Sequence, residues 1–206
     1  PVVGLIMSII AKLVVGVDVL DTSVSLDSFV MGIVISVLMG MFLTLPISSA
    51  AIGIILGLDG LAAGAATVGC CANMVGFAVA SYRENKFGGL LAQGVGTSMI
   101  QMPNIVKKPI IWFPPIIASA VLGPVSTCLL KMTCDASGAG MGTSGLVGQF
   151  MTYASMTEDG IDPTVVIIEI AIMHFIAPAL ISLAVSELMR KKKLISFGDM
   201  KLENTN

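Results

Sequence analysis

Two short glycine-rich stretches contain the hydroxyl and amide groups with which this chain could bind a polar solute. Gly94-Val95-Gly96-Thr97-Ser98 recurs as Gly140-Met141-Gly142-Thr143-Ser144, and a glutamine follows each copy. Hydroxyl and amide side chains are neutral donors and acceptors, which suits a solute rich in hydroxyl groups. The candidate binding residues in and after the two stretches are Thr97, Ser98, Gln101, Asn104, Thr143, Ser144 and Gln149.

The recurrence itself has two interpretations. It indicates either an internal duplication or two places where helices pack closely, because small residues at an interface let backbones approach one another. Glycine also permits positive φ angles, which an irregular segment inside a membrane would need.

Glu169 and His174 are the only ionisable residues of an otherwise apolar stretch, 163–186. A charged group at the centre of a membrane helix costs about 3 kcal/mol on insertion scales, so we expect both side chains to face the protein interior. On a straight α-helix, five positions rotate them about 140° apart, so one face does not obviously hold both. They are either solute ligands or members of a proton path, or else an interfacial carboxylate and a hydrogen-bonded core histidine.

Other chemistry finds little support in the sequence. It has no phosphate-binding or dinucleotide motif and no nucleophile with its base. The four cysteines lack metal-ligand spacing and suit packing roles, and a net charge of −2 gives no basic surface for nucleic acid. We therefore expect no catalysis, no cofactor, no metal and no nucleic-acid partner.

The composition assigns the chain to the lipid bilayer. Apolar residues make up 55% of it and charged residues only 12%, whereas soluble domains contain about 25% charged residues. Too few charges remain to cover a water-facing surface. We predict an all-α integral membrane protein, a multi-helix bundle.

Uncharged runs mark the elements, because a spanning helix needs about 20 apolar residues. The runs are 28–58, 60–82, 87–106, 109–130 and 136–157, with 163–186 as a sixth and 1–17 as a further candidate. The polar connections are short, so one membrane domain over 1–206 is expected. The first residue is Pro1 and not Met, and 1–17 lacks the features of a signal peptide. The start at Pro1 favours either a processed chain or the C-terminal part of a longer protein.

Basic residues predict the orientation, since Lys and Arg prefer the cytoplasmic side. The cluster at 190–193 places the tail 190–206 in the cytoplasm and the acidic segment 158–162 outside. Basic clusters at 83–86 and 107–108 also favour the cytoplasm, although an uncharged run separates them.

A re-entrant segment, entering and leaving on one side, reconciles these two clusters. We therefore predict re-entrant Gly-rich hairpins at 87–106 and, from the opposite side, at 136–157. Such an inverted pair is common in secondary transporters, which bind solute near the bilayer midplane. Irregular backbone survives there only where it is buried in protein or lines a cavity.

Several segments of the chain resemble one known family, and the similarity runs across most of the chain. They are Gln101-Met102-Pro103-Asn104-Ile105-Val106-Lys107-Lys108-Pro109, Ile111-Trp112-Phe113-Pro114-Pro115, Leu122-Gly123-Pro124 and the Gly138-to-Gln149 stretch with its Gly-Thr-Ser-Gly core. In these segments the chain resembles the EIIC-like membrane family of the bacterial phosphotransferase system, which also contains perfringolysin-type toxin regulators.

The resemblance implies a permease component in the bacterial inner membrane, homodimeric, that carries a sugar while separate soluble proteins handle phosphate. Well-studied members hold sugar hydroxyls with a His and a Glu, and Glu169 with His174 is the only such pair here. Family members are also longer than this chain, and it has no recognisable EIIA or EIIB segment.

Three functions remain open at this point. The first is a permease subunit for a small polar solute, a sugar or polyol, with the lipid bilayer and soluble phosphotransferase components as its other partners. The second is a membrane sensor or regulator that keeps the fold without transport, and the third is a proton-coupled transporter that uses Glu169 or His174.

Overall fold

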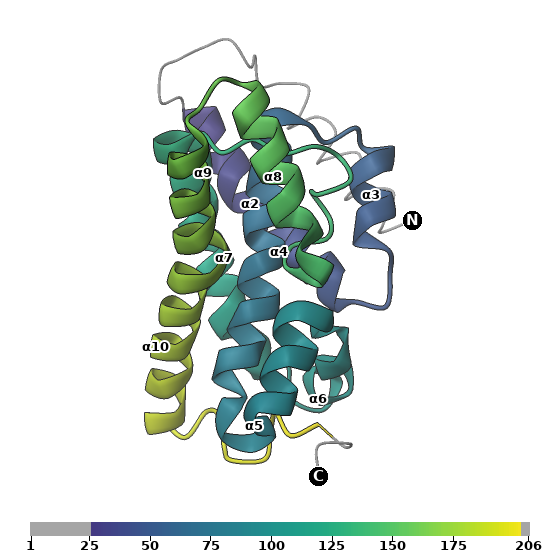
Figure 1. Ribbon diagram of the computed structural model, residues 1–206. Coiled ribbons are helices and arrows are strands. Elements are labelled where there is room, and N and C mark those ends of the chain that lie inside the picture. The colour runs from purple at the N-terminus through teal and green to yellow at the C-terminus, as the bar shows by residue number, and fades with distance from the viewer. Residues whose placement is uncertain (1–25, 203–206) are drawn as a thin grey trace.

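The computed structural model describes residues 26–202, which form helices and turns and include no strand (Figure 1). The candidate helix at 1–17 lies outside this range. The α-helices are α2 (Leu26–Thr44), α3 (Ser49–Ile55), α4 (Gly60–Ala80), α5 (Tyr82–Leu91), α6 (Met102–Lys107), α7 (Phe113–Pro124), α8 (Val147–Glu158), α9 (Pro163–Ile170) and α10 (Ala177–Lys191). The π-helical segments are η1 (Ala92–Gly96), η4 (Val125–Leu130) and η6 (Ala171–Ile176), and the 3₁₀ turns are η2 (Ser98–Gln101), η3 (Pro109–Trp112) and η5 (Ser144–Leu146).

Helix α4 lies at the centre of the bundle and is almost entirely buried, with α2, α7 and α10 packed against it. It is rich in Gly and Ala and has two cysteines, so its neighbours can approach its backbone. A Cβ on Gly69 would overlap the backbone of Ser36 in α2, and one on Gly123 of α7 would overlap the carbonyl oxygen of Gly32. In lipid no hydrophobic effect drives helices together, so the close van der Waals packing that small residues permit stabilises these crossings.

Within the described residues, three helical stretches are long and apolar enough to cross a bilayer: Gly60–Ala80, Pro109–Leu130 and Pro163–Lys191. The last of these, made of α9, η6 and α10, exposes Ile167 and Leu180 by 57% and 62%. Large aliphatic side chains so exposed along one helix suit contact with lipid tails. The prediction of an all-α integral membrane protein is confirmed.

The uncharged run 28–58 folds as two helices. Helix α2 ends at Thr44, two residues before Pro46, which cannot donate a helical hydrogen bond. Helix α3 then starts after Ser48, whose Oγ accepts a hydrogen bond from the Ala51 amide at 3.2 Å. A long uncharged run is therefore not by itself one membrane crossing.

The two glycine-rich runs also depart from plain helices. Residues 87–106 pass through the end of α5, the π-helical η1, the turn η2 and most of α6. Residues 136–146 form turns before α8 begins at Val147. In Figure 1, α5 and α6 lie at the end of the bundle where α10 ends, whereas α8 lies in the opposite half.

Candidate functional site

The two Gly-Thr-Ser stretches meet at an exposed hydrogen bond. The Ser144 hydroxyl donates a hydrogen bond to the Gly96 carbonyl oxygen at 2.9 Å. In each copy the serine begins a 3₁₀ turn that leads into an α-helix, η2 into α6 and η5 into α8.

The backbones of the two copies nevertheless differ. Thr97 is extended, with φ −160° and ψ 142°, and Thr143 is turn-like, with φ −85° and ψ 2°. Gly142 has φ +53°, and a Cβ there would lie 2.7 Å from Cβ of Cys70 in α4. Glycine is therefore required at position 142 both by the backbone angle and by the close approach to α4.

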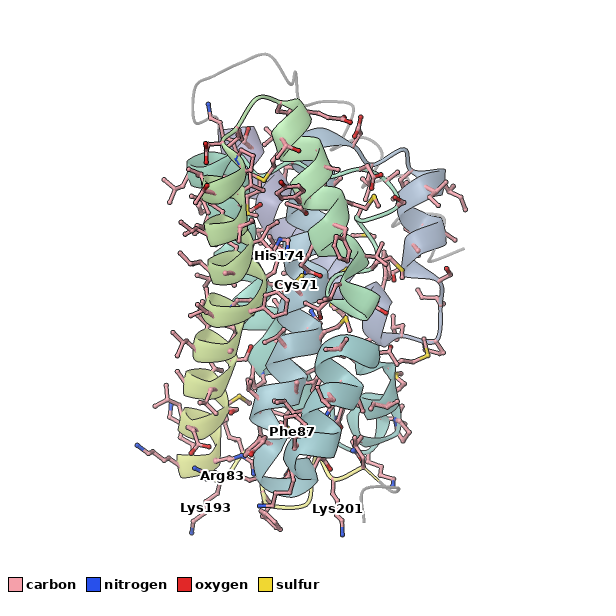
Figure 2. All side chains as sticks on the ribbon, in the orientation of Figure 1. Cys71, Arg83, Phe87, His174, Lys193 and Lys201 are labelled. Atoms are coloured by element: carbon pink, nitrogen blue, oxygen red, sulfur yellow. The ribbon has the colours of Figure 1, made fainter. Side chains whose placement is uncertain are left out.

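Gln149 and His174 form the polar centre of the second stretch. Gln149 is in the first turn of α8 and His174 in η6, and the Gln149 Nε2 lies 3.0 Å from the His174 Nδ1. The same Nε2 donates to the Cys71 sulfur of α4 at 3.3 Å. Both polar side chains are buried, with exposed fractions of 8% and 0%. Figure 2 shows His174 and Cys71 at the same level inside the bundle.

This contact leaves two polar atoms facing the interior. Because an amide nitrogen only donates, His174 Nδ1 accepts and its Nε2 carries the proton. Within residues 28–202 neither this Nε2 nor the Oε1 of Gln149 has a hydrogen-bond partner. Buried polar atoms are normally satisfied, so this donor and acceptor can bind a water molecule or a ligand.

Glu169 contributes a third such atom. The carboxylate is only partly buried, but its Oε2 is enclosed and has no hydrogen-bond partner among the side chains of the described range. The π-helical segment η6, which starts two residues after Glu169, changes the expected angle between Glu169 and His174. Bonds from i to i+5 widen the turn, so residues five apart come closer to one face than on an α-helix.

Ser98 belongs to a different polar group. Its hydroxyl lies 2.9 Å from that of Thr44, and Thr44 is linked to Asn73 of α4 at 3.4 Å. Asn73 in turn accepts from the Trp112 indole at 3.1 Å and donates to the Ser119 hydroxyl at 3.2 Å. Sequence reasoning missed Thr44, Asn73 and Ser119; an asparagine within an uncharged run was the signal available.

The remaining residues of the first stretch have local or distant partners. Thr97 caps η2, accepting from the Met99 amide at 3.1 Å. Gln101 and Asn104 donate to the carbonyl oxygens of Met200 and Lys201, both at 3.0 Å. These two side chains therefore hold the C-terminal segment.

The structure brings together two of the predicted residues, Gln149 and His174, and separates the others. Glu169 lies on the same long helix as His174, five positions earlier, and the Thr143 hydroxyl lies 3.4 Å from the Met74 sulfur of α4. Ser144 joins the two stretches, whereas Ser98, Gln101 and Asn104 belong to other groups of contacts.

Comparisons with known proteins assign the chain to a family. The family described as Phosphotransferase system, EIIC, matches residues 1–202. No curated protein and no solved structure matches the chain. Since that match covers nearly all of the sequence, and the described residues form an apolar helical bundle, the chain belongs to the EIIC family of phosphotransferase-system membrane proteins.

Proposed function

We propose that this chain is a permease component that binds a sugar or polyol at Gln149, His174 and Glu169. The observation that carries the proposal is the unpaired donor at His174 Nε2 beside the unpaired acceptor at Gln149 Oε1. A solute hydroxyl both donates and accepts, so one hydroxyl can satisfy the pair. The enclosed Glu169 oxygen suits a second hydroxyl of the same solute.

The arrangement of the glycine-rich stretches supports alternating access. We propose that 87–106 and 136–157 are re-entrant segments, since they occupy opposite halves of the bundle in Figure 1 and touch where Ser144 meets Gly96. A single hydrogen bond, of about 0.5–1.5 kcal/mol, closes this junction. Moving one glycine-rich segment relative to the other would expose the buried Gln149–His174 pair to one side of the membrane at a time.

The distribution of charge supports an orientation. Arg83, Lys193 and Lys201 all lie at the end of the bundle that holds the C-terminal segment (Figure 2). Following the preference of basic residues for the cytoplasm, we propose that the tail from residue 190 is cytoplasmic in a bacterial inner membrane. Soluble phosphotransferase components would then meet this face, and we expect a homodimer as in other EIIC proteins.

A binding measurement tests the proposal. The full-length protein in nanodiscs is screened by thermal shift against a panel of sugars and polyols, and at least one should stabilise it. Gln149→Ala and His174→Ala should each abolish the shift. Gln93→Ala is the matched control, because Gln93 is also a buried glutamine but bonds to Ser81 and Gln101.

The outcomes separate the alternatives. A shift that Gln93→Ala retains and His174→Ala loses supports the proposed site. Gln101→Ala tests whether the first glycine-rich stretch also contributes to solute binding, as the sequence predicted. A panel without any stabilising solute, on protein that is folded, would contradict the permease proposal and favour a sensor that moves nothing.

A further inference from the structure

The chain returns on itself after α10. Residues 195–202 pass beneath α5 and α6 and bury three apolar side chains, Ile195, Met200 and Leu202. Ile195 and Met200 join a cluster with Phe77, Ile105 and Ile111. Residues 195–202 therefore dock at a defined site on the bundle.

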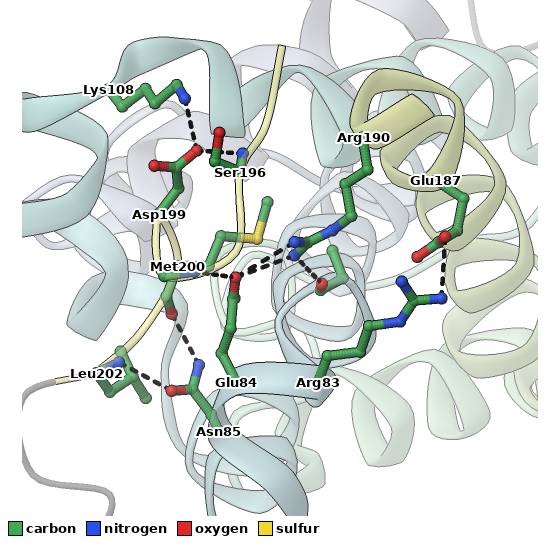
Figure 3. A network of polar contacts seen from close by, with 12 residues as sticks. Arg83, Glu84, Asn85, Lys108, Glu187, Arg190, Ser196, Asp199, Met200 and Leu202 are labelled. Carbon is green, nitrogen blue, oxygen red and sulfur yellow. Dashed lines mark hydrogen bonds and ion pairs between the residues drawn. The ribbon is translucent and has the colours of Figure 1, made fainter. Parts of the chain in front are cut away.

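Side-chain amides recognise the main chain of this segment. The Asn85 amide donates to the Met200 carbonyl oxygen and accepts from the Leu202 amide, both at 2.8 Å (Figure 3). Gln101 donates to the same Met200 oxygen, and Asn104 donates to the Lys201 oxygen. Helix α5, the turn η2 and helix α6 therefore each contribute a group that holds the segment.

An ion pair and a hydrogen bond to a carboxylate hold the middle of the segment. The Lys108 ammonium lies 2.6 Å from the Asp199 carboxylate. Glu84 of α5 pairs with Arg190 of α10 at 3.3 Å, and the same Glu84 oxygen accepts from the Gly198 amide at 2.9 Å (Figure 3). Glu84 thus connects the last long helix, which contains His174, to the returning segment.

The contacts continue into the first glycine-rich stretch. The Gln101 side-chain amide donates to the Oε1 of Gln93 at 2.9 Å, and the Gln93 Nε2 donates to the Ser81 hydroxyl at 2.8 Å. Asn104 also donates to Gln101 at 2.8 Å. A continuous line of hydrogen bonds therefore runs from the Met200 carbonyl to η1.

We propose that residues 195–202 are an internal ligand whose docking site is formed by Glu84, Asn85, Gln101, Asn104 and Lys108, and whose binding holds the first glycine-rich stretch in place. Because the proposed permease cycle would move this stretch relative to the second one, release of the segment would accompany that movement; this consequence rests on the proposed function. The docking itself does not.

Hydrogen–deuterium exchange on the full-length protein in nanodiscs tests the proposal without any solute. Asp199→Lys places like charges together and should speed exchange about tenfold in both 195–202 and 92–107, since both lose protection with one opening event. The charge swap Lys108→Asp with Asp199→Lys should restore part of the protection in both, since it restores the ion pair but not the hydrogen bond from the Ser196 amide. Glu187→Lys, which breaks the exposed Arg83–Glu187 pair at the same end, should leave both unchanged.

Other outcomes would overturn the proposal. If 195–202 opens while 92–107 keeps its protection, the segment does not hold the glycine-rich stretch. A charge swap that restores none of the protection lost in Asp199→Lys would refute the assigned docking contact. Asn85→Ala changes no charge and gives the same comparison should Asp199→Lys not fold.

Discussion

The Gln149 amide, 3.0 Å from the His174 ring, joins the second glycine-rich stretch to the longest helix of the described bundle. The contact depends on the elements that position the two residues. Gly142 lets the preceding turn approach α4, and the π-helical segment η6 carries His174. The Gln149–His174 contact therefore forms only when α4, α8 and η6 are correctly placed relative to one another.

A double-mutant cycle should detect this contact. Gln149→Ala and His174→Ala, alone and together, are compared by the free energy of unfolding in SDS titration. We expect a coupling energy of about 0.5–1.5 kcal/mol, the usual net value of a hydrogen bond. Additive effects of the two substitutions would show that the side chains do not interact.

The buried ion pair of Arg190 and Glu84 should be far more sensitive to mutation than an exposed pair nearby. Their side chains are 10% and 0% exposed. Arg190→Met leaves the Glu84 charge uncompensated, for which we expect a loss of about 3–5 kcal/mol in the free energy of unfolding. Arg83→Met breaks the more exposed pair with Glu187 and should cost about 0–1 kcal/mol. Equal losses in the two variants would contradict the burial of Glu84.

The crossing of α2 and α4 should not tolerate a methyl group. A Cβ on Gly69 would overlap the backbone of Ser36, so Gly69→Ala must separate the two helices, at a cost of about 1–3 kcal/mol or more. Gly88 is the matched control, because it lies in α5 with open space around it. Gly88→Ala should be neutral or stabilise the protein by up to about 1 kcal/mol. Thermal unfolding in nanodiscs measures both.

Residue types predicted the membrane bundle and part of the candidate site. The low charge and the uncharged runs were enough for the bundle, because lipid imposes a strong composition on every spanning helix. Intramembrane ionisable residues are costly, and this argument correctly directed His174 to the interior. Glu169, for which the same argument was made, is only partly buried. The direct contact between Gln149 and His174 was not predicted, because it depends on how α8 packs against the last long helix.

Gln101 and Asn104 show the limit of reasoning from motifs. Their partners are the carbonyl oxygens of Met200 and Lys201, and main-chain groups are present in every residue. No pattern in the tail distinguishes a free cytoplasmic end from one that folds back. The π-helical segment η6 was likewise not predicted; Pro178, which cannot donate to the His174 carbonyl, lies in the first turn of α10, directly after η6.

Acid should loosen the returning segment through Asp199. Partial burial opposes its ionisation, but hydrogen bonds from Lys108 and the Ser196 amide, with the charges of Lys108 and Arg190, outweigh burial and lower the pKa of Asp199 below its ordinary value of 3.8. A carboxyl group with a lowered pKa stabilises the folded state above its unfolded pKa. That contribution is lost as the pH falls through the folded value.

We therefore expect the protection of residues 196–202 to be constant between pH 7 and pH 5 and to fall below about pH 4, the usual range of an aspartate. This expectation is checked by measuring the opening equilibrium of the segment across pH, with exchange rates corrected for their intrinsic pH dependence. Asp199→Asn removes the titrating group, so its segment should be less protected at neutral pH and should change less on acidification. A wild-type segment that stays equally protected down to pH 2 would show that the Lys108–Asp199 pair contributes nothing to the docking.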